Sequence, residues 1–155
     1  MVFAIMSPSF ADQAEIPIQY TCEGKDIAPP LAWTDVPAGT KSLAIIVDDP
    51  DAPDPRAPRM TWAHWVVLDI PRTATGLPEG GALPPGSRAG KNDWKRTAYN
   101  GPCPPIGRHR YFFKLYALDT GFPELMAPTK AELEAVMRGH VVGHAQLVGM
   151  YEKKR

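Results

Sequence analysis

The sequence lacks several features that define common protein classes. It has no excess of charge of one sign, because 17 Lys and Arg residues balance 17 Asp and Glu residues. Such a chain is not expected to bind nucleic acid through its overall field, so any recognition of anions has to be local. Its longest apolar runs, "LAIIV" and "WVVL", are far shorter than the roughly 20 residues that span a bilayer. We therefore predict no nucleic-acid partner and no transmembrane segment.

Cysteine is scarce, and the first residues lack the features of a secretory signal. The segment "MVFAIMSPSF" has no Lys or Arg before its short apolar run. We therefore predict a cytoplasmic protein whose two cysteines, Cys22 and Cys103, are thiols rather than a structural bridge. The sequence leaves that pairing open, because two cysteines allow one disulfide.

Proline, in contrast, is abundant, with 18 residues in a chain of 155. Proline removes a backbone donor and disfavours helix interiors, so strands joined by rigid loops are expected. Apolar runs and alternating patterns predict strands or β pieces in six segments: 15–21, 29–37, 42–48, 61–70, 110–118 and 141–151. Strict alternation in the fourth segment would place these side chains on one face: Trp62, His64, Val66, Leu68 and Ile70.

One helix is predicted near the C-terminus, over residues 129–140. Thr129 and Glu132 have the spacing of a capping box, and Leu133 begins a buried face at helical spacing. The polar Gly- and Pro-rich segment 73–100 is too long for a simple connection, so it is functional or mobile. The fold prediction is a mainly β (β-rich α+β) single domain over residues 1–155.

Two stretches carry side chains suited to binding chemistry. In "DDPDAPDPRAPRMTWAHW", Asp49 and Asp51 leave the end of a buried strand among prolines, and His64 lies on the next strand. In "GPCPPIGRHRY", a Gly-Pro loop precedes His109 and Tyr111. Imidazoles and turn N–H groups suit a small anion, and proline holds such a loop ready for its ligand.

These two stretches, together with "IPIQYTCEGKDIAPPLAW", "VPAGTKSLAIIVDDPDAP" and "GKNDW", resemble the phosphatidylethanolamine-binding protein (PEBP) family. The likeness is to its short bacterial, Raf-kinase-inhibitor-like branch, and it covers most of the chain. The resemblance implies a central β-sheet packed on a smaller sheet. It also implies a small pocket for phosphate-type anions or phospholipid headgroups, and a homodimer.

The resemblance also implies the residues of the pocket. They are Asp49, Pro53, His64, Gly101, Pro102, His109 and Tyr111. Asp51 is instead interpreted as a cap within its turn. Arg110 alternates with His109 along a strand and is expected to point the other way, into an ion pair.

A carboxylate beside a bound phosphate needs a reason, because like charges repel. Asp49 could orient a histidine through a hydrogen bond, be protonated, or accept a hydrogen bond from the ligand, and the first role is favoured. The pocket is then expected to prefer a zwitterionic or singly protonated ligand. Binding is expected to weaken as the pH rises through the histidine pKa.

The predicted function is therefore non-enzymatic binding, with no cofactor and no metal. The first alternative is an interaction module that inhibits a kinase or protease through the same pocket. The second is a hydrolase that uses either a metal ion held by Asp and His or a Cys103–His109 nucleophile pair. No HExxH or G-x-S-x-G pattern supports the hydrolase.

Overall fold

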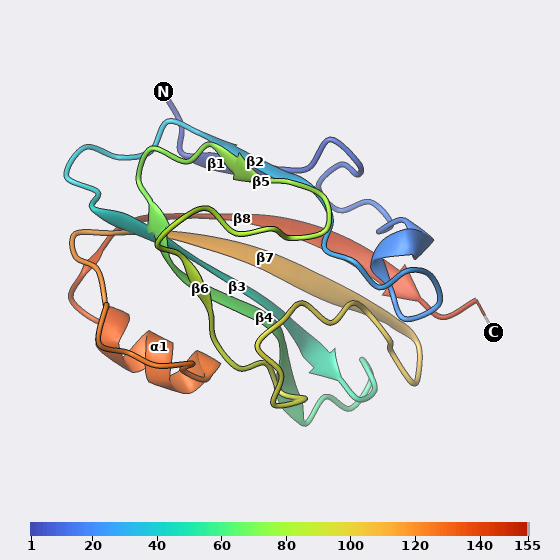
Figure 1. Cartoon of the computed structure of the whole chain (residues 1–155). Helices are drawn as coiled ribbons and strands as arrows, with labels where there is room; N and C mark the ends of the chain where they lie inside the picture. Colours follow the sequence, from blue (N-terminus) through green and yellow to red (C-terminus); the bar gives the residue numbers. More distant parts are fainter. Residues whose placement is uncertain (155) are drawn as a thin grey trace.

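Two antiparallel β-sheets and one α-helix make up the computed structural model, which describes residues 1–154 (Figure 1). The larger sheet has the strand order β6-β4-β3-β7-β8 and the smaller one β1-β2-β5. The strands are β1 (Ala4–Met6), β2 (Leu31–Thr34), β3 (Ser42–Ala52), β4 (Met60–Pro71), β5 (Gly76–Leu77), β6 (Arg88–Ala89), β7 (Arg108–Leu118) and β8 (Val141–Glu152). The predicted mainly β fold, with a central sheet and a smaller one, is confirmed.

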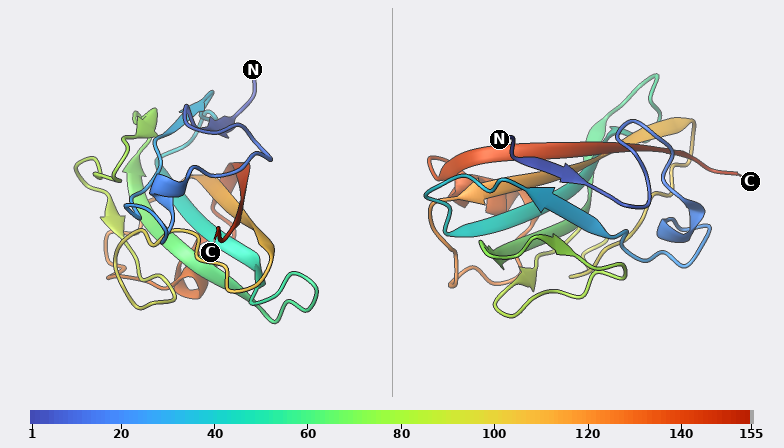
Figure 2. Two further views of the ribbon diagram at one scale, coloured as in Figure 1. Left: turned by 90° about the vertical axis from the view of Figure 1, so that its right-hand side faces the viewer. Right: turned by 90° about the horizontal axis from the view of Figure 1, so that it is seen from above.

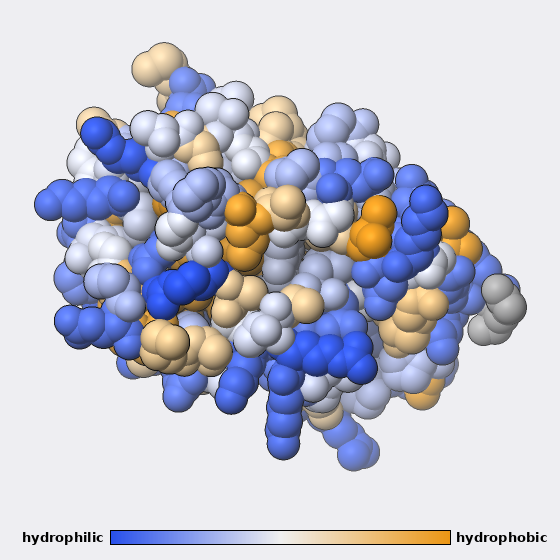
Figure 3. Space-filling model, in the orientation of Figure 1, coloured by the Kyte–Doolittle hydropathy of each residue, from blue (hydrophilic) through white to orange (hydrophobic). Residues whose placement is uncertain are grey.

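The large sheet is the middle of three layers, with the small sheet on one face and helix α1 (Lys130–Met137) on the other (Figures 1 and 2). Between the sheets, Trp33 of β2 packs with Ile45 of β3 and Phe113 of β7. On the other face, Leu133 and Met137 of the helix pack against the sheet. The surface seen in Figure 3 is mostly hydrophilic, with hydrophobic residues in small separate groups. Across residues 1–154, no helix is long and apolar enough to cross a bilayer.

β4 lies where the sequence places a strand, but its faces differ from strict alternation. The register with β3 shifts between the pairs Val47↔Trp65 and Asp48↔Ala63, which leaves His64 as an extra residue. His64 and Trp65 consequently both lie on the face that carries the small sheet, where the His64 ring contacts Tyr111. A second shift, between the pairs Leu43↔Ile70 and Ile45↔Val67, separates Leu68 from Ile70. The predicted face is therefore wrong: Ile70 packs between the sheets, whereas Val66 and Leu68 pack toward the helix.

The first predicted β piece, residues 15–21, is confirmed only at its start, where Glu15 bridges Met150 of β8. The following residues form a 3₁₀ turn, η1 (Ile18–Tyr20), because Pro17 has no N–H for a sheet ladder and Tyr20 folds inward, where it is 1% exposed. The helix prediction is confirmed: Thr129 is the N-cap, and its capping box with Glu132 is complete.

The long segment 73–100 is not a single loop. It contributes β5 to the small sheet and β6 to the large sheet. Its last part, residues 92–100, folds back onto β4, where Asp93 N–H donates to the Ala63 carbonyl and Asn100 N–H to the His64 carbonyl. This segment therefore carries residues to the histidine of the predicted pocket.

Candidate functional site

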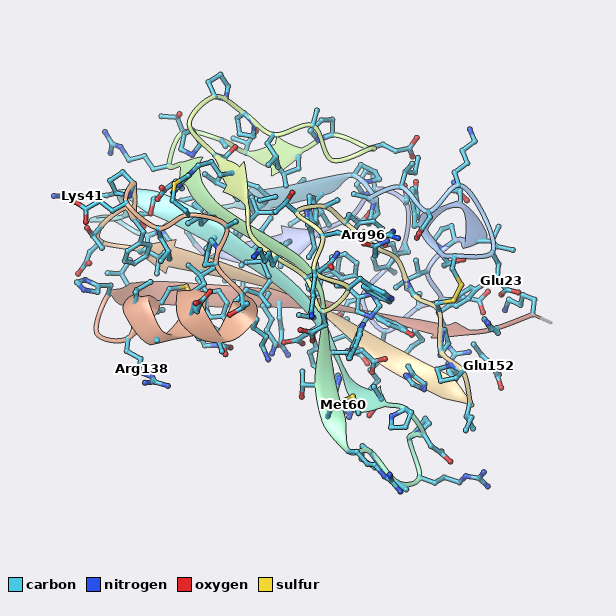
Figure 4. The ribbon with its side chains drawn as sticks, turned by 60° about the horizontal axis from the view of Figure 1, so that its bottom comes forward. Glu23, Lys41, Met60, Arg96, Arg138 and Glu152 are labelled. Atoms are coloured by element: carbon cyan, nitrogen blue, oxygen red, sulfur yellow. A yellow bond between two sulfur atoms is a disulfide. The ribbon has the colours of Figure 1, made fainter. Side chains whose placement is uncertain are left out.

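A cavity of about 240 Å³ opens where the β3–β4 hairpin, the 92–100 loop and the 101–107 loop meet. Its walls come from segments far apart in the sequence, and Met60, labelled in Figure 4, marks its hairpin side. The lining residues are Asp49, Ala52, Pro53, Met60, Trp62, His64, Trp94, Cys103, Pro104, Pro105, His109 and Tyr111. The fold thus brings together five of the seven predicted site residues: Asp49, Pro53, His64, His109 and Tyr111.

The centre of the cavity holds a buried carboxylate–imidazole pair. His109 Nδ1 lies 2.6 Å from Asp49 Oδ2, and His109 Nε2 lies 2.8 Å from the Ile106 carbonyl oxygen. Asp51 N–H donates to the other oxygen of Asp49 at 2.7 Å. The predicted hydrogen bond from a histidine to Asp49 is present. Both nitrogens of His109 are occupied within the protein, so its ring lines the cavity without an N–H left for a ligand.

The partners of His109 also fix the charge of the pair. A carbonyl only accepts, so Nε2 carries a hydrogen, and one further proton lies between Nδ1 and Asp49 Oδ2. Burial raises the pKa of the Asp49 carboxyl, while the hydrogen bonds from His109 and Asp51 oppose that rise. Whichever atom holds the shared proton, the pair has no net charge.

His64 presents a hydrogen-bond acceptor to the cavity. Its Nδ1 lies 2.7 Å from the Asn100 carbonyl oxygen, so Nδ1 carries the hydrogen. Burial lowers the pKa of His64 to about 4, which keeps the ring neutral at pH 7. Neutral imidazole with Nδ1–H has a lone pair on Nε2. The expected weakening of binding as the pH rises through the histidine pKa therefore gains no support from His64, because its ring is already neutral at pH 6.

Tyr111 presents a donor. Its side chain is 1% exposed, and across residues 1–154 only its hydroxyl and Asp48 Oδ1 are buried polar side-chain atoms without a hydrogen-bond partner. Burial, followed by the charge of Asp49, raises the pKa of the Tyr111 hydroxyl, so it stays protonated. The Tyr111 ring lies edge-on to His64, with ring centres 5.2 Å apart. An unpartnered buried hydroxyl is costly unless something occupies the site.

The remaining walls are largely apolar and aromatic. The rings of Trp62 and Trp94 meet edge to face at 5.5 Å, and Trp94 also contacts His64 at 5.0 Å. Aromatic faces attract cations as well as apolar groups. Trp94 was not predicted as a site residue. Trp94 reaches the cavity because residues 92–100 fold back onto β4, and no local sequence pattern predicts that fold-back. Trp94 is nevertheless part of "GKNDW", one of the stretches that resemble the family.

Gly101 and Pro102 lie behind the cavity wall, outside its lining. Gly101 N–H donates to Asp26 Oδ1 at 2.7 Å, and the Pro102 carbonyl accepts from Cys22 N–H at 3.1 Å. A side chain on Gly101 would collide with the Tyr20 carbonyl, since its Cβ would lie 2.1 Å from that oxygen. Both residues therefore shape the loop, and direct ligand contact from them stays a prediction.

Asp51 and Arg110 form an ion pair away from the cavity. Arg110 donates to Asp51 through its backbone N–H at 2.9 Å and its guanidinium at 2.8 and 3.0 Å. These hydrogen bonds lower the pKa of the Asp51 carboxyl. The predicted ion pair of Arg110 is confirmed. The predicted turn-cap role of Asp51 is wrong, because its carboxylate accepts from Arg110 of β7 and joins two strands.

The prediction of two free thiols is wrong. Cys22 and Cys103 form a disulfide with a Cα–Cα distance of 5.4 Å, visible near Glu23 in Figure 4. The hydrogen bonds of Gly101 and Pro102 hold the two segments together, 81 residues apart in sequence, which brings the sulfurs within bonding distance. In this state Cys103 has no thiol to act as a nucleophile. Within residues 1–154, no group of three or more His, Cys, Asp or Glu side chains could hold a metal ion.

Known proteins share this fold and much of this sequence. A sequence model of the phosphatidylethanolamine-binding protein family matches residues 6–152. The chain belongs to the phosphatidylethanolamine-binding protein family. A UPF0098 protein of Methanothermobacter thermautotrophicus is 48% identical over 94% of this chain and 95% of its own length. A UPF0098 protein of Chlamydia pneumoniae is 44% identical, over 96% and 98%.

Two solved structures of PEBP family members superpose closely on this one. A PEBP homologue from Chlamydia trachomatis has a TM-score of 0.90 at 38% identity, with 98% of each chain covered. YbcL of E. coli, described as a member of the mammalian PEBP family, has a TM-score of 0.88 at 33% identity, covering 98% of this chain and 99% of its own. A carboxypeptidase Y inhibitor solved with its cognate proteinase, at 20% identity and a TM-score of 0.62, shares the fold alone.

Proposed function

We propose that this PEBP-family protein binds the phosphate-bearing headgroup of a small molecule or phospholipid, with phosphoethanolamine as the type of ligand, and catalyses no reaction on it. The observation that carries the proposal is Tyr111, a residue of the cavity lining whose buried hydroxyl has no hydrogen-bond partner within the protein. A phosphate oxygen is a suitable acceptor for that hydroxyl. The cavity of about 240 Å³ is below the usual range for drug-sized ligands, which favours a headgroup-sized ligand.

The charges of the cavity favour a zwitterion over a dianion. The Asp49–His109 pair has no net charge, and among residues 1–154 no Lys or Arg lines the cavity. A fully ionised phosphate would therefore find no net positive charge there to balance its own. The ammonium of an ethanolamine group, in contrast, can donate to His64 Nε2 and lie against the faces of Trp62 and Trp94. The two ends of one headgroup thus fit the donor and the acceptor of the cavity.

Two features support a binding role rather than catalysis. The disulfide leaves Cys103 without the thiolate that a cysteine nucleophile needs. His109 is committed on both nitrogens, and His64, which has a free Nε2, has a pKa of about 4 that makes it a weak general base. Binding therefore uses every cavity group that has free hydrogen-bonding capacity.

Calorimetric titration with O-phosphoethanolamine at pH 7 tests the proposal. Wild-type protein is expected to bind one ligand per chain, and Tyr111→Phe to bind about tenfold more weakly, because one hydrogen bond to a charged oxygen is worth about 1.5 kcal/mol. Inorganic phosphate distinguishes a free anion from a headgroup as the source of the ligand. Absence of heat with both compounds at millimolar concentration would refute the proposal.

A protein partner is the second candidate, and the rim of the cavity favours it. Met60 and Trp94 of the lining are 44% and 38% exposed, and Ile106 beside it is 48% exposed. Exposed apolar side chains around a pocket are typical of a docking surface. A kinase or protease that offers an acidic or phosphorylated side chain would use the same cavity. Release of a captured partner by free O-phosphoethanolamine would support this function.

A cytoplasmic location and a homodimer also stay predictions. The prediction of free thiols followed from the cytoplasmic location, and the disulfide bears on that location because disulfides persist mainly in oxidising compartments. Alkylation of thiols before cell lysis tests the location: modified Cys22 and Cys103 would support a reducing compartment, and unmodified cysteines an oxidising one. Light scattering of the purified protein measures the mass and so tests the dimer.

A further inference from the structure

The buried side-chain amide of Asn92 holds the 92–100 loop, which reaches the cavity, in its conformation. Asn92 is 3% exposed, and its side chain satisfies all of its hydrogen-bonding groups within the 92–100 loop. Its Oδ1 accepts from the backbone N–H groups of Trp94 at 2.9 Å and Arg96 at 3.1 Å. Its Nδ2 donates to the Ala98 carbonyl at 2.8 Å, to Asn100 Oδ1 at 2.7 Å and, at 3.4 Å, to the backbone carbonyl of His64 on β4.

These partners fix the orientation of the amide as well. Backbone N–H groups can only donate and carbonyls can only accept, so exchanging Oδ1 and Nδ2 of Asn92 would break at least four of the five hydrogen bonds. The Asn92 side chain therefore holds the loop together through hydrogen bonds. The loop conformation depends on a side chain with two donors and two acceptors.

The loop in turn determines the chemistry of His64. Asn100, held by Asn92, places its carbonyl 2.7 Å from His64 Nδ1 and so requires the hydrogen on that nitrogen. Trp94, held through its backbone by Asn92, covers the His64 ring at a centre-to-centre distance of 5.0 Å. Two contacts that define the ring at the cavity wall thus come from residues bonded to Asn92, and the edge-on Tyr111 ring supplies a third.

We propose that Asn92 is a positioning residue that holds His64 in the Nδ1–H tautomer, so that the pocket selects ligands whose cationic end donates an N–H to Nε2. The inference rests on the proposed headgroup function for its ligand class. Its structural part, the tautomer, stands independently of any ligand.

The proposal makes a distinction between two headgroups of the same charge. O-Phosphoethanolamine has an ammonium with three N–H donors, whereas the quaternary ammonium of O-phosphocholine has none. Attraction to Trp62 and Trp94 alone would serve both cations. With Nε2 as an acceptor, O-phosphoethanolamine is expected to bind at least about fivefold more tightly, the effect of roughly one hydrogen bond.

The test combines a tautomer measurement with this pair of ligands. ¹⁵N NMR of the imidazole nitrogens, with His64 assigned by comparison with His64→Gln, reports which nitrogen carries the hydrogen. In Asn92→Asp the carboxylate still accepts from Trp94 and Arg96 but cannot donate to Ala98 and Asn100. We expect this variant to populate the Nε2–H tautomer and to lose the preference for O-phosphoethanolamine, to within about twofold.

Two further variants keep the result interpretable. Ser42→Ala is the matched control: it removes a buried hydroxyl that donates to the Thr120 carbonyl, far from the cavity, and should change neither readout. If Asn92→Asp fails to fold, Asn100→Ala removes one acceptor of Asn92 while leaving the backbone carbonyl that faces His64. We expect Asn100→Ala to shift the tautomer in the same direction.

The outcomes separate this inference from the proposed function. An unchanged His64 tautomer in a folded Asn92→Asp or Asn100→Ala protein overturns the inference even if the wild type binds ligand. Equal binding of both headgroups by the wild type overturns the ligand selection. A wild type that binds neither headgroup refutes the proposed function, while a shifted tautomer would still support the role of Asn92.

Discussion

Asp48 and Asp49 are neighbours on β3, yet their carboxylates lie on opposite faces of the large sheet. Asp49 faces the cavity and is paired with His109, a buried residue with no exposed side-chain area. Asp48 faces the helix side, where Lys114 Nζ lies at 3.0 Å and Lys130 Nζ at 3.2 Å from its Oδ2. Those lysine side chains keep 27% and 21% of their area exposed.

The difference shows how the same residue type serves two purposes. On the helix face, mobile ammonium groups in contact with water balance a buried charge, and Asp48 keeps one oxygen without a hydrogen bond. On the cavity face, a rigid imidazole balances the charge, and every hydrogen-bonding group of the pair has a partner. The first arrangement tolerates rearrangement, whereas the second holds a fixed geometry next to a ligand.

The largest expected effect comes from truncating each carboxylate in turn. Asp49→Ala leaves the buried donors of His109 and Asp51 without an acceptor, so we expect a loss of about 3–5 kcal/mol in the free energy of unfolding and no ligand binding. Asp48→Ala lets two lysines turn to water, and should cost no more than about 1 kcal/mol. Urea unfolding measures both. Equal costs would contradict the comparison.

The Cys22–Cys103 disulfide lies on the cavity side of the molecule, because Cys103 lines the cavity. Cys22→Ser opens an 81-residue loop, and we expect a loss of about 2–4 kcal/mol in the free energy of unfolding. Ligand affinity should change much less, because the backbone hydrogen bond from Cys22 to Pro102 remains. Urea unfolding and calorimetry of the variant, with reduced wild type as a second sample, separate the two effects. A larger loss of binding than of stability would show that the bridge itself shapes the pocket.

Acid is expected to lower the free energy of unfolding mainly through His64 on the cavity face. Burial lowers the pKa of His64 to about 4, below the ordinary 6.5 of the unfolded chain, so its contribution to stability is complete above pH 6.5 and is lost as the pH falls toward 4. The expected loss is up to about 3 kcal/mol. The raised pKa of Asp49 has the opposite effect, since it adds stability as the pH falls. The contribution of His64 is therefore isolated by comparing the wild type with His64→Gln, whose free energy of unfolding should fall less over this pH range.

The matched control for that acid series is His140 on the helix side. Its side chain is 45% exposed and pairs with Asp119. His140→Gln should leave the acid slope of the wild type nearly unchanged. A flat wild-type profile between pH 6.5 and 4 would show that His64 is charged in the folded protein.

The smallest effect on stability is expected for Tyr111→Phe. The hydroxyl has no protein partner, so its removal should leave the free energy of unfolding unchanged within about 0.5 kcal/mol, or raise it slightly. Ligand binding, in contrast, should weaken about tenfold. A substantial loss of stability would mean that the hydroxyl has a structural partner, such as an ordered water, instead of a ligand.

The sequence predicts the long strands and the helix well, because their apolar periods and the Thr129–Glu132 box are local signals. It fails where geometry depends on distant segments. The bulge at His64 breaks strict alternation on β4, and nothing in "TWAHWVVLDI" announces it. The disulfide depends on hydrogen bonds between residues 22–26 and 101–102 that only the fold creates.

The sequence predicted most residues of the site but not their hydrogen-bonding roles. Family resemblance supplied Asp49, His64, His109 and Tyr111, all of which line the cavity. Which imidazole nitrogens remain available depends on carbonyls of residues 100 and 106, which carry no sequence signal. For the same reason the sequence suggested protonated imidazoles as anion donors, whereas the structure leaves an acceptor at His64 and a donor at the tyrosine.

The central claim is that the cavity face binds a headgroup and the helix face does not. NMR chemical-shift mapping of the backbone amides during titration with O-phosphoethanolamine tests it most directly. The account predicts saturable shifts confined to residues 49–64 and 92–111, and none around Lys130. Shifts centred on Lys114 and Lys130, or no shifts at millimolar ligand, would contradict it.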